Sequence, residues 1–375
     1  MLPTWRRQRP GRNITAIRIS CWSLSRTARL VSSSGGRHDE ADDRGRLPAH
    51  ARRPPRGNGR RLLRRPRAIV VGTGVIGTGW IIRALAHNKI VIAFDKDLKQ
   101  EKSLIKEIRR AWPFAKKLFN KKKLNLKKFK YVTSIKEAVK KADFIQECAP
   151  ENYLIKTRLM NVIGKYARSN AIISSSSSGL LPTKIYSKCK NPTRTMIGHP
   201  FNPVYLCPGV EIVPGKKTEK KFINKANKFY KSISMNPIIV KKELSGYLST
   251  RLQEALWREA LHIINEGYAS TKDLDRSIED GPGLRWSLMG TFLTFHMAGG
   301  KAGMKHMLKQ FGPALKLPWT KLKAPKLSKK LSSRVIAGTR QQTKGKSVAM
   351  ISNIRDEYLV NLQKLRKKYE NKIRK

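Results

Sequence analysis

The stretch that decides the fold is RAIVVGTGVIGTGWIIRALAHNKIVIAFDKD, residues 67 to 97, and it reads as strand, glycine turn, helix, strand and acid. Ala68–Val71 is a short β-rich run, and an apolar segment of helix length follows the glycines. A second predicted strand, Ile90–Phe94, ends directly before Asp95. This order is the one that a dinucleotide-binding unit requires.

Each glycine of Gly72-x-Gly74-x-x-Gly77 has its own physical role. Gly72 permits the tight turn, Gly74 lets backbone amides approach a pyrophosphate, and Gly77 lets the helix pack closely on the strand. Asp95 follows the last glycine by eighteen residues, where it would accept hydrogen bonds from ribose hydroxyls and repel a 2'-phosphate. The unit therefore predicts NAD rather than NADP, the alternative being a glycine turn in an unrelated α/β domain.

Strand and helix patterns alternate up to about residue 244. The lysine-rich segment Leu98–Lys130 is predicted to be a solvated helix, and Phe144–Glu147 to be a buried strand. Three β-rich segments follow, TMIGHPFNP, GVEIVPG and NPIIVKKE, with a predicted helix Glu219–Ser232 between the last two. This alternation continues a doubly wound α/β pattern.

The pattern changes from Gly246 onward. Apolar residues then recur at helical spacing, at Leu248, Leu252, Leu256, Ala260 and Ile263, and the rest reads as helices broken by Pro and Gly. We predict the α/β class: an N-terminal Rossmann-like NAD-binding domain over residues 67–244 with a doubly wound sheet. An all-α domain with a basic C-terminal tail is predicted over residues 245–375.

Residues 1–66 differ from the rest in composition. All their basic side chains other than histidine are arginines, whereas lysine dominates from Ala68 onward. Few core-forming residues and much Pro, Gly and Arg predict a disordered extension. The alternative is an Arg- and Ser-rich mitochondrial transit peptide over residues 1–36, which would place the protein in the matrix rather than in the cytoplasm.

The formal charge of +55 raises the question of nucleic acid binding. Lysines are spread over the whole body, which indicates a solvated surface rather than one binding stripe, so we expect no nucleic acid partner. A non-catalytic nucleic-acid-binding protein on a Rossmann scaffold is the more distant alternative. We expect no membrane segment, because Arg83 interrupts the best apolar run, and no metal site, because the four cysteines have no C-x-x-C spacing.

The stretch GHPFNPVYLCPGVE, residues 198 to 211, contains a candidate acid/base. Prolines on both sides of Phe201-Asn202 exclude a helix and place His199 at a rigid bend. A histidine that takes a hydroxyl proton needs a second group to fix its tautomer, and Glu211 is the available carboxylate. The alternative is that His199 packs or caps a strand end.

A serine run, Ser174 to Ser178, ends a predicted buried strand at the edge where open α/β sheets bind their ligands. Ser178 could donate a hydrogen bond to the reacting oxygen. The alternative is a low-complexity turn.

The motifs GTGVIG, QECAPEN, SSSSSGLLP, GHPFNPVYLCPGVE and GYLSTRL resemble the 3-hydroxyacyl-CoA dehydrogenase superfamily, which includes sugar-acid dehydrogenases of the lambda-crystallin type. The resemblance runs from about Ala68 to near the C-terminus. It implies that His199 is the acid/base, that Glu211 orients it and that Ser178 bonds to the substrate. The NAD-contacting positions that it implies are Gly72, Gly74, Gly77, Asp95, Glu151, Lys156 and Asn202.

One position departs from that pattern. Thr250 stands where acyl-CoA members have a substrate-contacting asparagine, which argues against an acyl-CoA-like pose of the substrate. Three longer segments, EALWREALHIINEG, GPGLRWSLMGTFLTFHMAGGKAGM and QFGPALKLPWTKL, look like the carnitine dehydrogenase group within the superfamily. They imply NAD-dependent oxidation of the C3 hydroxyl of carnitine by a homodimer joined through its helical domains. The alternative substrates are a sugar acid or a 3-hydroxyacyl-CoA.

A quaternary ammonium group cannot donate a hydrogen bond, so aromatic faces should recognise it. Phe201 adjoins the histidine turn, and Trp286 and Phe311 lie in the carnitine-type segments. Arg285 could pair with the substrate carboxylate. The alternative is that the two helical-domain rings pack in a core and that the arginine is only solvated.

Overall fold

The computed structural model describes residues 67–375 except 122, 289, 322, 324, 325, 327, 345 and 375. These residues belong to one unit, Arg61–Lys375. The predicted extension over residues 1–66 lies outside the described residues.

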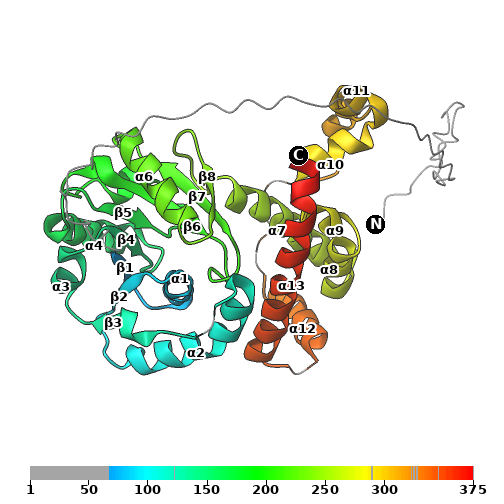
Figure 1. Cartoon of the computed structure of the whole chain (residues 1–375). Helices are drawn as coiled ribbons and strands as arrows, with labels where there is room; N and C mark the ends of the chain where they lie inside the picture. Colours follow the sequence, from blue (N-terminus) through cyan, green and yellow to red (C-terminus); the bar gives the residue numbers. More distant parts are fainter. Residues whose placement is uncertain are drawn as a thin grey trace, which may run out of the picture. The chain divides into compact units, whose positions relative to one another are not determined.

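An eight-stranded sheet forms the first part of the described chain (Figure 1). Its order is β3-β2-β1-β4-β5-β6-β7-β8, and every neighbouring pair is parallel except β6 and β7. The strands are β1 Arg67–Val71, β2 Ile90–Phe94, β3 Phe129–Val132, β4 Phe144–Glu147, β5 Ile172–Ser175, β6 Thr195–Pro200, β7 Gly209–Pro214 and β8 Asn236–Ile239.

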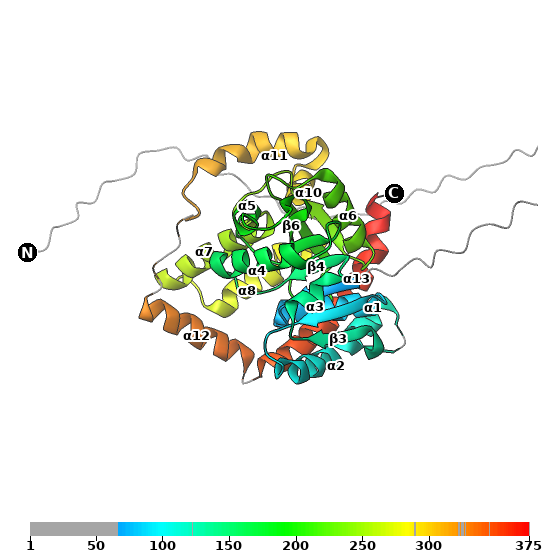
Figure 2. The same ribbon diagram turned by 90° about the vertical axis from the view of Figure 1, so that its left-hand side faces the viewer.

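Helices cover both faces of the sheet. One hydrophobic core lies under α1, α2 and α6, and a second lies under α3, α4 and α5, the side from which Figure 2 is viewed. In β1, Val70 joins the first core while Ile69 and Val71 join the second, as alternation along a strand requires. The helices are α1 Val75–Ala86, α2 Gln100–Phe119, α3 Ile135–Lys140, α4 Tyr153–Tyr166, α5 Pro182–Ile185 and α6 Lys220–Lys231.

The described part of the chain after β8 contains only helices. They are α7 Ser249–Glu266, α8 Thr271–Glu279, α9 Pro282–Trp286, α10 Thr291–Ala298, α11 Gly303–Phe311, α12 Lys329–Thr343 and α13 Val348–Arg374. Each helix within the described ranges is too short or too polar to span a membrane.

The predicted fold class is confirmed: a doubly wound, mostly parallel sheet is followed by an all-helical region. The helix predicted over Leu98–Lys130 was wrong beyond Phe119. Asn120 is left-handed and ends α2, and Phe129–Val132 pairs with β2 as an edge strand. Phe129 and Tyr131 face the first core, and Lys130 between them is exposed. An edge strand tolerates such an exposed lysine, and lysines of this kind are the reason why the sequence predicted a solvated helix.

Candidate active site

The predicted site residues gather at one edge of the sheet. The parallel strands β1, β4, β5 and β6 all end at this edge, and the antiparallel β7 begins there. The glycine turn, the serine run and His199 follow or close these strands. An open α/β sheet binds its ligands at this edge.

His199 and Glu211 face each other across the β6–β7 hairpin. The register pairs the two residues directly, and His199 Nδ1 lies 2.7 Å from Glu211 Oε2. Glu211 is fully buried and the His199 side chain is 8% exposed. His199 Nε2 has no hydrogen-bond partner in the part of the chain that the structure describes.

The second oxygen of Glu211 is held by the segment that begins α7. Oε1 accepts hydrogen bonds from the backbone N–H groups of Leu248 and Ser249, both at 3.0 Å, and from the Ser249 hydroxyl at 3.3 Å. Burial by itself raises the pKa of Glu211, but the hydrogen bonds from His199, Ser249 and Leu248 outweigh it and hold that pKa below its ordinary value. A charged Glu211 accepts a hydrogen bond from the N–H group at Nδ1, so the lone pair of the neutral imidazole lies on Nε2.

The serine run is a set of separate hydrogen-bonding positions rather than a low-complexity turn. Ser174 bonds to Tyr230, Ser175 donates to Glu147, Ser176 accepts from Trp80 and Gln146, and Ser177 donates to Glu151. The exposed Ser178 hydroxyl has no hydrogen bond among the described residues. It is therefore the one hydroxyl of the run that is available to a ligand.

Glu151 and Lys156 support the turn that follows the serines. Glu151 Oε1 accepts from Ser177 Oγ and from the backbone N–H groups of Ser178 and Gly179. Lys156 is 1% exposed, and its Nζ lies 2.9 Å from Glu147 Oε1 and 3.6 Å from Glu151 Oε2.

Glu147 is a residue that the sequence reasoning missed. It is fully buried and binds Lys156, Ser175 Oγ and the Ala149 N–H. The sequence did contain a signal for Glu147: it is an acid in a predicted buried strand, FIQE, and a buried carboxylate needs a charged or hydrogen-bonding partner.

The β1–α1 turn has the features that a dinucleotide needs. Gly72 has φ +96°, and a Cβ on Gly77 would lie 2.0 Å from the Gly72 carbonyl oxygen, so close packing requires both glycines. A Cβ on Gly74 would have no neighbour within 4 Å, which leaves room beside the first turn of α1. That turn has no acid and no side-chain cap, so its N–H groups remain for an anion.

Asp95 is held in place by the same turn. The Thr73 N–H and hydroxyl both donate to Asp95 Oδ2, at 3.0 and 2.8 Å. Oδ1 has no hydrogen bond among the described residues and can accept from ribose hydroxyls. The donor set and the room at Gly74 fit a bound NAD.

A cleft of about 1090 Å³ lies beside His199. The predicted residues that line it are Ser178, His199, Phe201, Asn202 and Thr250. The Thr250 hydroxyl donates to the Ser178 carbonyl oxygen at 3.0 Å, so it fixes the serine turn against α7. Arg285, Trp286 and Phe311 do not line this cleft, and Arg285 borders a separate cavity with Phe295 and Met297.

Trp257 and Tyr247 are two further residues of this region that the sequence reasoning did not select. Trp257 lines the cleft from α7 and is 52% exposed. Tyr247 is buried with its ring centroid 5.6 Å from that of His199, and its hydroxyl donates to the Leu180 carbonyl. Helical periodicity marked the apolar stripe of α7 but not which of its side chains meets the cleft.

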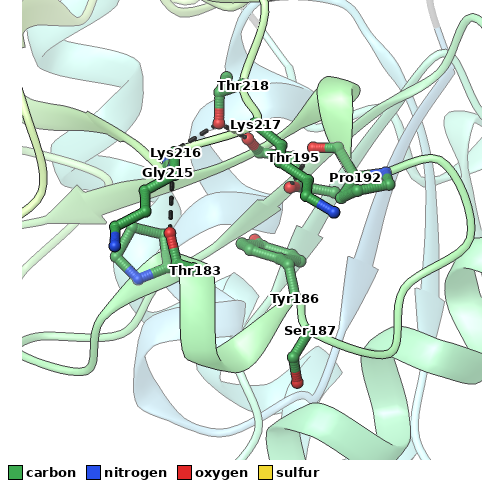
Figure 3. A pocket seen from close by; sticks show the side chains of 10 residues that line it. Thr183, Tyr186, Ser187, Pro192, Thr195, Gly215, Lys216, Lys217 and Thr218 are labelled. Atoms are coloured by element: carbon green, nitrogen blue, oxygen red, sulfur yellow. Dashed lines mark hydrogen bonds between the residues drawn. The ribbon is translucent and has the colours of Figure 1, made fainter.

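A smaller cavity of about 220 Å³ lies at the opposite edge of the sheet, where β6 begins and β7 ends (Figure 3). Its threonine hydroxyls bind backbone groups: Thr183 Oγ1 accepts from Lys216 N–H, and Thr218 Oγ1 donates to the Thr195 carbonyl. None of the predicted site residues lines it. The cleft at His199 is therefore the candidate active site.

Residues 67–244 match the NAD binding domain of 3-hydroxyacyl-CoA dehydrogenase, and residues 246–338 match the C-terminal domain of the same family. The L-carnitine dehydrogenase of Oceanobacillus iheyensis is 48% identical over 78% of this chain and 95% of its own length. The L-carnitine dehydrogenase of Pseudomonas putida is 48% identical over 77% of this chain and 90% of its own length.

Solved structures share the fold. An NAD-dependent 5-formyl-3-hydroxy-2-methylpyridine 4-carboxylic acid 5-dehydrogenase has a TM-score of 0.69 at 24% identity, covering 81% of this chain and 99% of its own. The (S)-3-hydroxybutyryl-CoA dehydrogenase of Ralstonia eutropha has a TM-score of 0.53 at 24% identity, covering 65% and 84%. With two matched domains and relatives at nearly half identity, the chain belongs to the 3-hydroxyacyl-CoA dehydrogenase family and is an NAD-dependent 3-hydroxy-acid dehydrogenase.

Proposed function

We propose that the protein oxidises the C3 hydroxyl of L-carnitine to 3-dehydrocarnitine, with His199 as the acid/base. The observation that carries the proposal is the His199–Glu211 pair: Nδ1 contacts the carboxylate, and His199 lines a cleft large enough for a small 3-hydroxy acid. The identity to L-carnitine dehydrogenases supports carnitine over a sugar acid or an acyl-CoA.

The chemistry of the chain is a proton transfer at His199 Nε2. The hydroxyl proton of the substrate moves to Nε2, and the imidazolium so formed is stabilised by the buried carboxylate of Glu211 at Nδ1. Glu211 itself is kept charged and in place by the N–H groups of Leu248 and Ser249. The Ser178 hydroxyl donates to the reacting oxygen.

NAD supplies the acceptor for the hydride that leaves C3. The pyrophosphate would be held at the Gly72–Gly77 turn, and the adenosine ribose by Asp95. Glu151, which lies close to Lys156, holds the turn after the serine run. The strand before this turn, β5, lies between the strands that lead to the glycine turn and to His199. Asn202, in the cleft, remains a proposed NAD contact.

The direct test is a substrate panel with the purified protein and NAD, followed by the absorbance of NADH. We expect reduction of NAD with L-carnitine and much slower reduction with D-carnitine, a sugar acid or 3-hydroxybutyryl-CoA. Faster turnover of a sugar acid or an acyl-CoA than of L-carnitine would contradict the proposal.

The mechanism is tested by His199→Ala and Glu211→Gln. Each should lower kcat about 100- to 10,000-fold, the usual contribution of a general acid/base, and leave NAD affinity nearly unchanged. His306→Ala is the matched control, because His306 is exposed and lies outside the cleft. Near-normal turnover of the His199 variant would eliminate the mechanism.

We also propose that the helical region over residues 245–375 joins two copies of the chain and contributes to the substrate cleft, with residues 67–244 binding NAD. Large apolar side chains on this region support it: Phe292 is 83%, Leu315 is 85% and Trp319 is 71% exposed. A surface of this kind is typical of an interface. Light scattering that gave the mass of a single chain at micromolar concentration would contradict the dimer.

A further inference from the structure

The charge of the His199 cleft is opposite to that of the chain. The sequence has 80 Lys and Arg residues against 25 Asp and Glu residues. Among the described residues that line the cleft, three are carboxylates, Glu254, Glu259 and Asp275, and none is Lys or Arg. Such a local reversal makes the cleft favourable for a cation and unfavourable for an anion.

One face of α7 forms the wall of this cleft. Thr250, Glu254 and Trp257 lie four and three residues apart, so their side chains share that face. Thr250 is fixed to the Ser178 carbonyl, which places Glu254 and Trp257 one and two turns away from the serine turn. The wall therefore continues from the hydroxyl-binding end of the cleft to an acid and an indole ring.

Trp257 lies on the cleft side of α7 and outside the cores of the sheet. It is 52% exposed. The face of a tryptophan ring is the best aromatic surface for a cation that cannot donate hydrogen bonds. Phe201 lines the same cleft, with its ring centroid 5.3 Å from that of His199.

Glu254 is more available to a ligand than Glu259. Its Oε2 is 3.8 Å from Arg258 Nε, and both side chains are about half exposed, at 49% and 45%, so that pair is weak. Glu259, by contrast, accepts the backbone N–H of Lys321 at 2.7 Å.

We propose that Glu254 and Trp257 form a cation subsite that receives the quaternary ammonium group of the substrate while Ser178 and His199 bind its hydroxyl. The subsite rests on the proposed oxidation of carnitine and makes the enzyme specific for cationic 3-hydroxy acids. It assigns the ammonium end to Trp257 rather than to Trp286 or Phe311, which lie outside the cleft.

The test compares two substrates in three variants, Trp257→Leu, Trp257→Phe and Glu254→Gln. L-Carnitine is paired with its carbon analogue, in which a tert-butyl group replaces the trimethylammonium group, so that the cation is removed and the carboxylate is kept. Trp257→Leu should raise the KM for carnitine about 2- to 30-fold, and Trp257→Phe should recover much of that loss, because a ring face is restored. Glu254→Gln should raise the same KM several-fold, and less so at high salt.

Matched controls come from outside the cleft. Trp286→Leu and Glu279→Gln should leave both KM values within about twofold of the parent, since neither side chain lines the cleft. The KM for the carbon analogue should also stay within about twofold in the Trp257 variants, and Glu254→Gln should not raise it. Tetramethylammonium chloride should inhibit the parent competitively against carnitine, at an ionic strength matched with sodium chloride, and should inhibit Trp257→Leu much less.

Two failures are distinguishable. If the parent enzyme oxidises neither carnitine nor its analogue, the proposed function is wrong. If the parent oxidises carnitine but Trp257→Leu and Glu254→Gln change the KM of both substrates equally, or of neither, the cation subsite is wrong while the function stands. Thermal unfolding of each variant excludes loss of the fold as the cause.

Discussion

Replacement of Arg83 tests how the turn after His199 is held. Arg83 is fully buried in α1 and has no carboxylate partner among the residues that the structure describes. Its three nitrogens donate to five backbone carbonyls at 2.7 to 3.1 Å, those of Val204, Leu206, Cys207, Ile233 and Ser234. Burial lowers the pKa of Arg83 to about 9, so the guanidinium is still charged at neutral pH. The NAD-binding helix thus fixes the segment that directly follows Phe201-Asn202.

Arg83→Met keeps the apolar stem but removes every donor. Three of the bonded carbonyls, Val204, Leu206 and Ile233, are fully buried and would lose their partner. An unsatisfied buried group costs about 1–3 kcal/mol, and relief of the buried charge offsets part of this, so we expect a net loss of roughly 3 to 5 kcal/mol. At about 2–4 °C per kcal/mol, Tm should fall by roughly 10 °C.

The assay is urea unfolding followed by fluorescence, with thermal unfolding by circular dichroism. Arg83→Lys is the matched control, because it keeps the charge but a single ammonium cannot reach five carbonyls spread around a planar fork. We expect the lysine variant to be destabilised nearly as much as the methionine variant. A loss below about 1 kcal/mol in either variant would refute the reasoning, since that is the typical worth of one hydrogen bond.

Three other predictions concern the glycine turn, Glu211 and residues 1–66. Gly74→Ala should keep the parent Tm but bind NAD more weakly, whereas Gly77→Ala should lower Tm because its Cβ would lie 2.0 Å from the Gly72 carbonyl oxygen. Calorimetry with NAD and thermal unfolding separate the two effects, and a lower Tm for Gly74→Ala than for Gly77→Ala would contradict the packing argument. The pKa of Glu211 in the folded protein lies below its ordinary 4.5, so its charge stabilises the folded state above about pH 4.5, and this stabilisation is lost as the pH falls further. The difference in Tm between the parent and Glu211→Gln should therefore shrink as the pH is lowered. A difference in Tm that stays constant would show that ionisation of Glu211 is not involved. A chain that begins at Arg65 should keep the Tm and NAD affinity of the full chain, because residues 1–66 have too few apolar side chains to offset their ordering entropy. A lower Tm of the shortened chain would show that the extension packs on the rest of the protein.

The β1–α1 unit was readable from the sequence because its constraints are local. The positive φ of Gly72 and the contact between residues 77 and 72 involve positions within one turn of each other. The same holds for His199 and Glu211, since two strands joined by a short connection place residues opposite each other in a defined register. Only the direct pairing and the 2.7 Å contact needed the structure.

The end of α2 and the buried partner of Lys156 were not readable. Lysine favours a helix over a strand, so the sequence predicted helix up to Lys130, and pairing with β2 decided that Phe129 and Lys130 belong to a strand. Glu147 and Lys156 lie on different elements, and their ion pair exists only because the sheet places α4 beside the end of β4.

The sequence by itself determined the class of fold and the cofactor, and it also indicated the His199–Glu211 pair that we propose to be catalytic, because these features depend on residues joined by short connections. The tertiary structure decided which aromatic and acidic side chains line the cleft. Trp257 and Trp286 both lie in segments of the carnitine type, yet of the two only Trp257 lines the cleft beside His199. Helical periodicity defines the faces of α7, but contacts with strands distant in the chain determine which face borders the substrate.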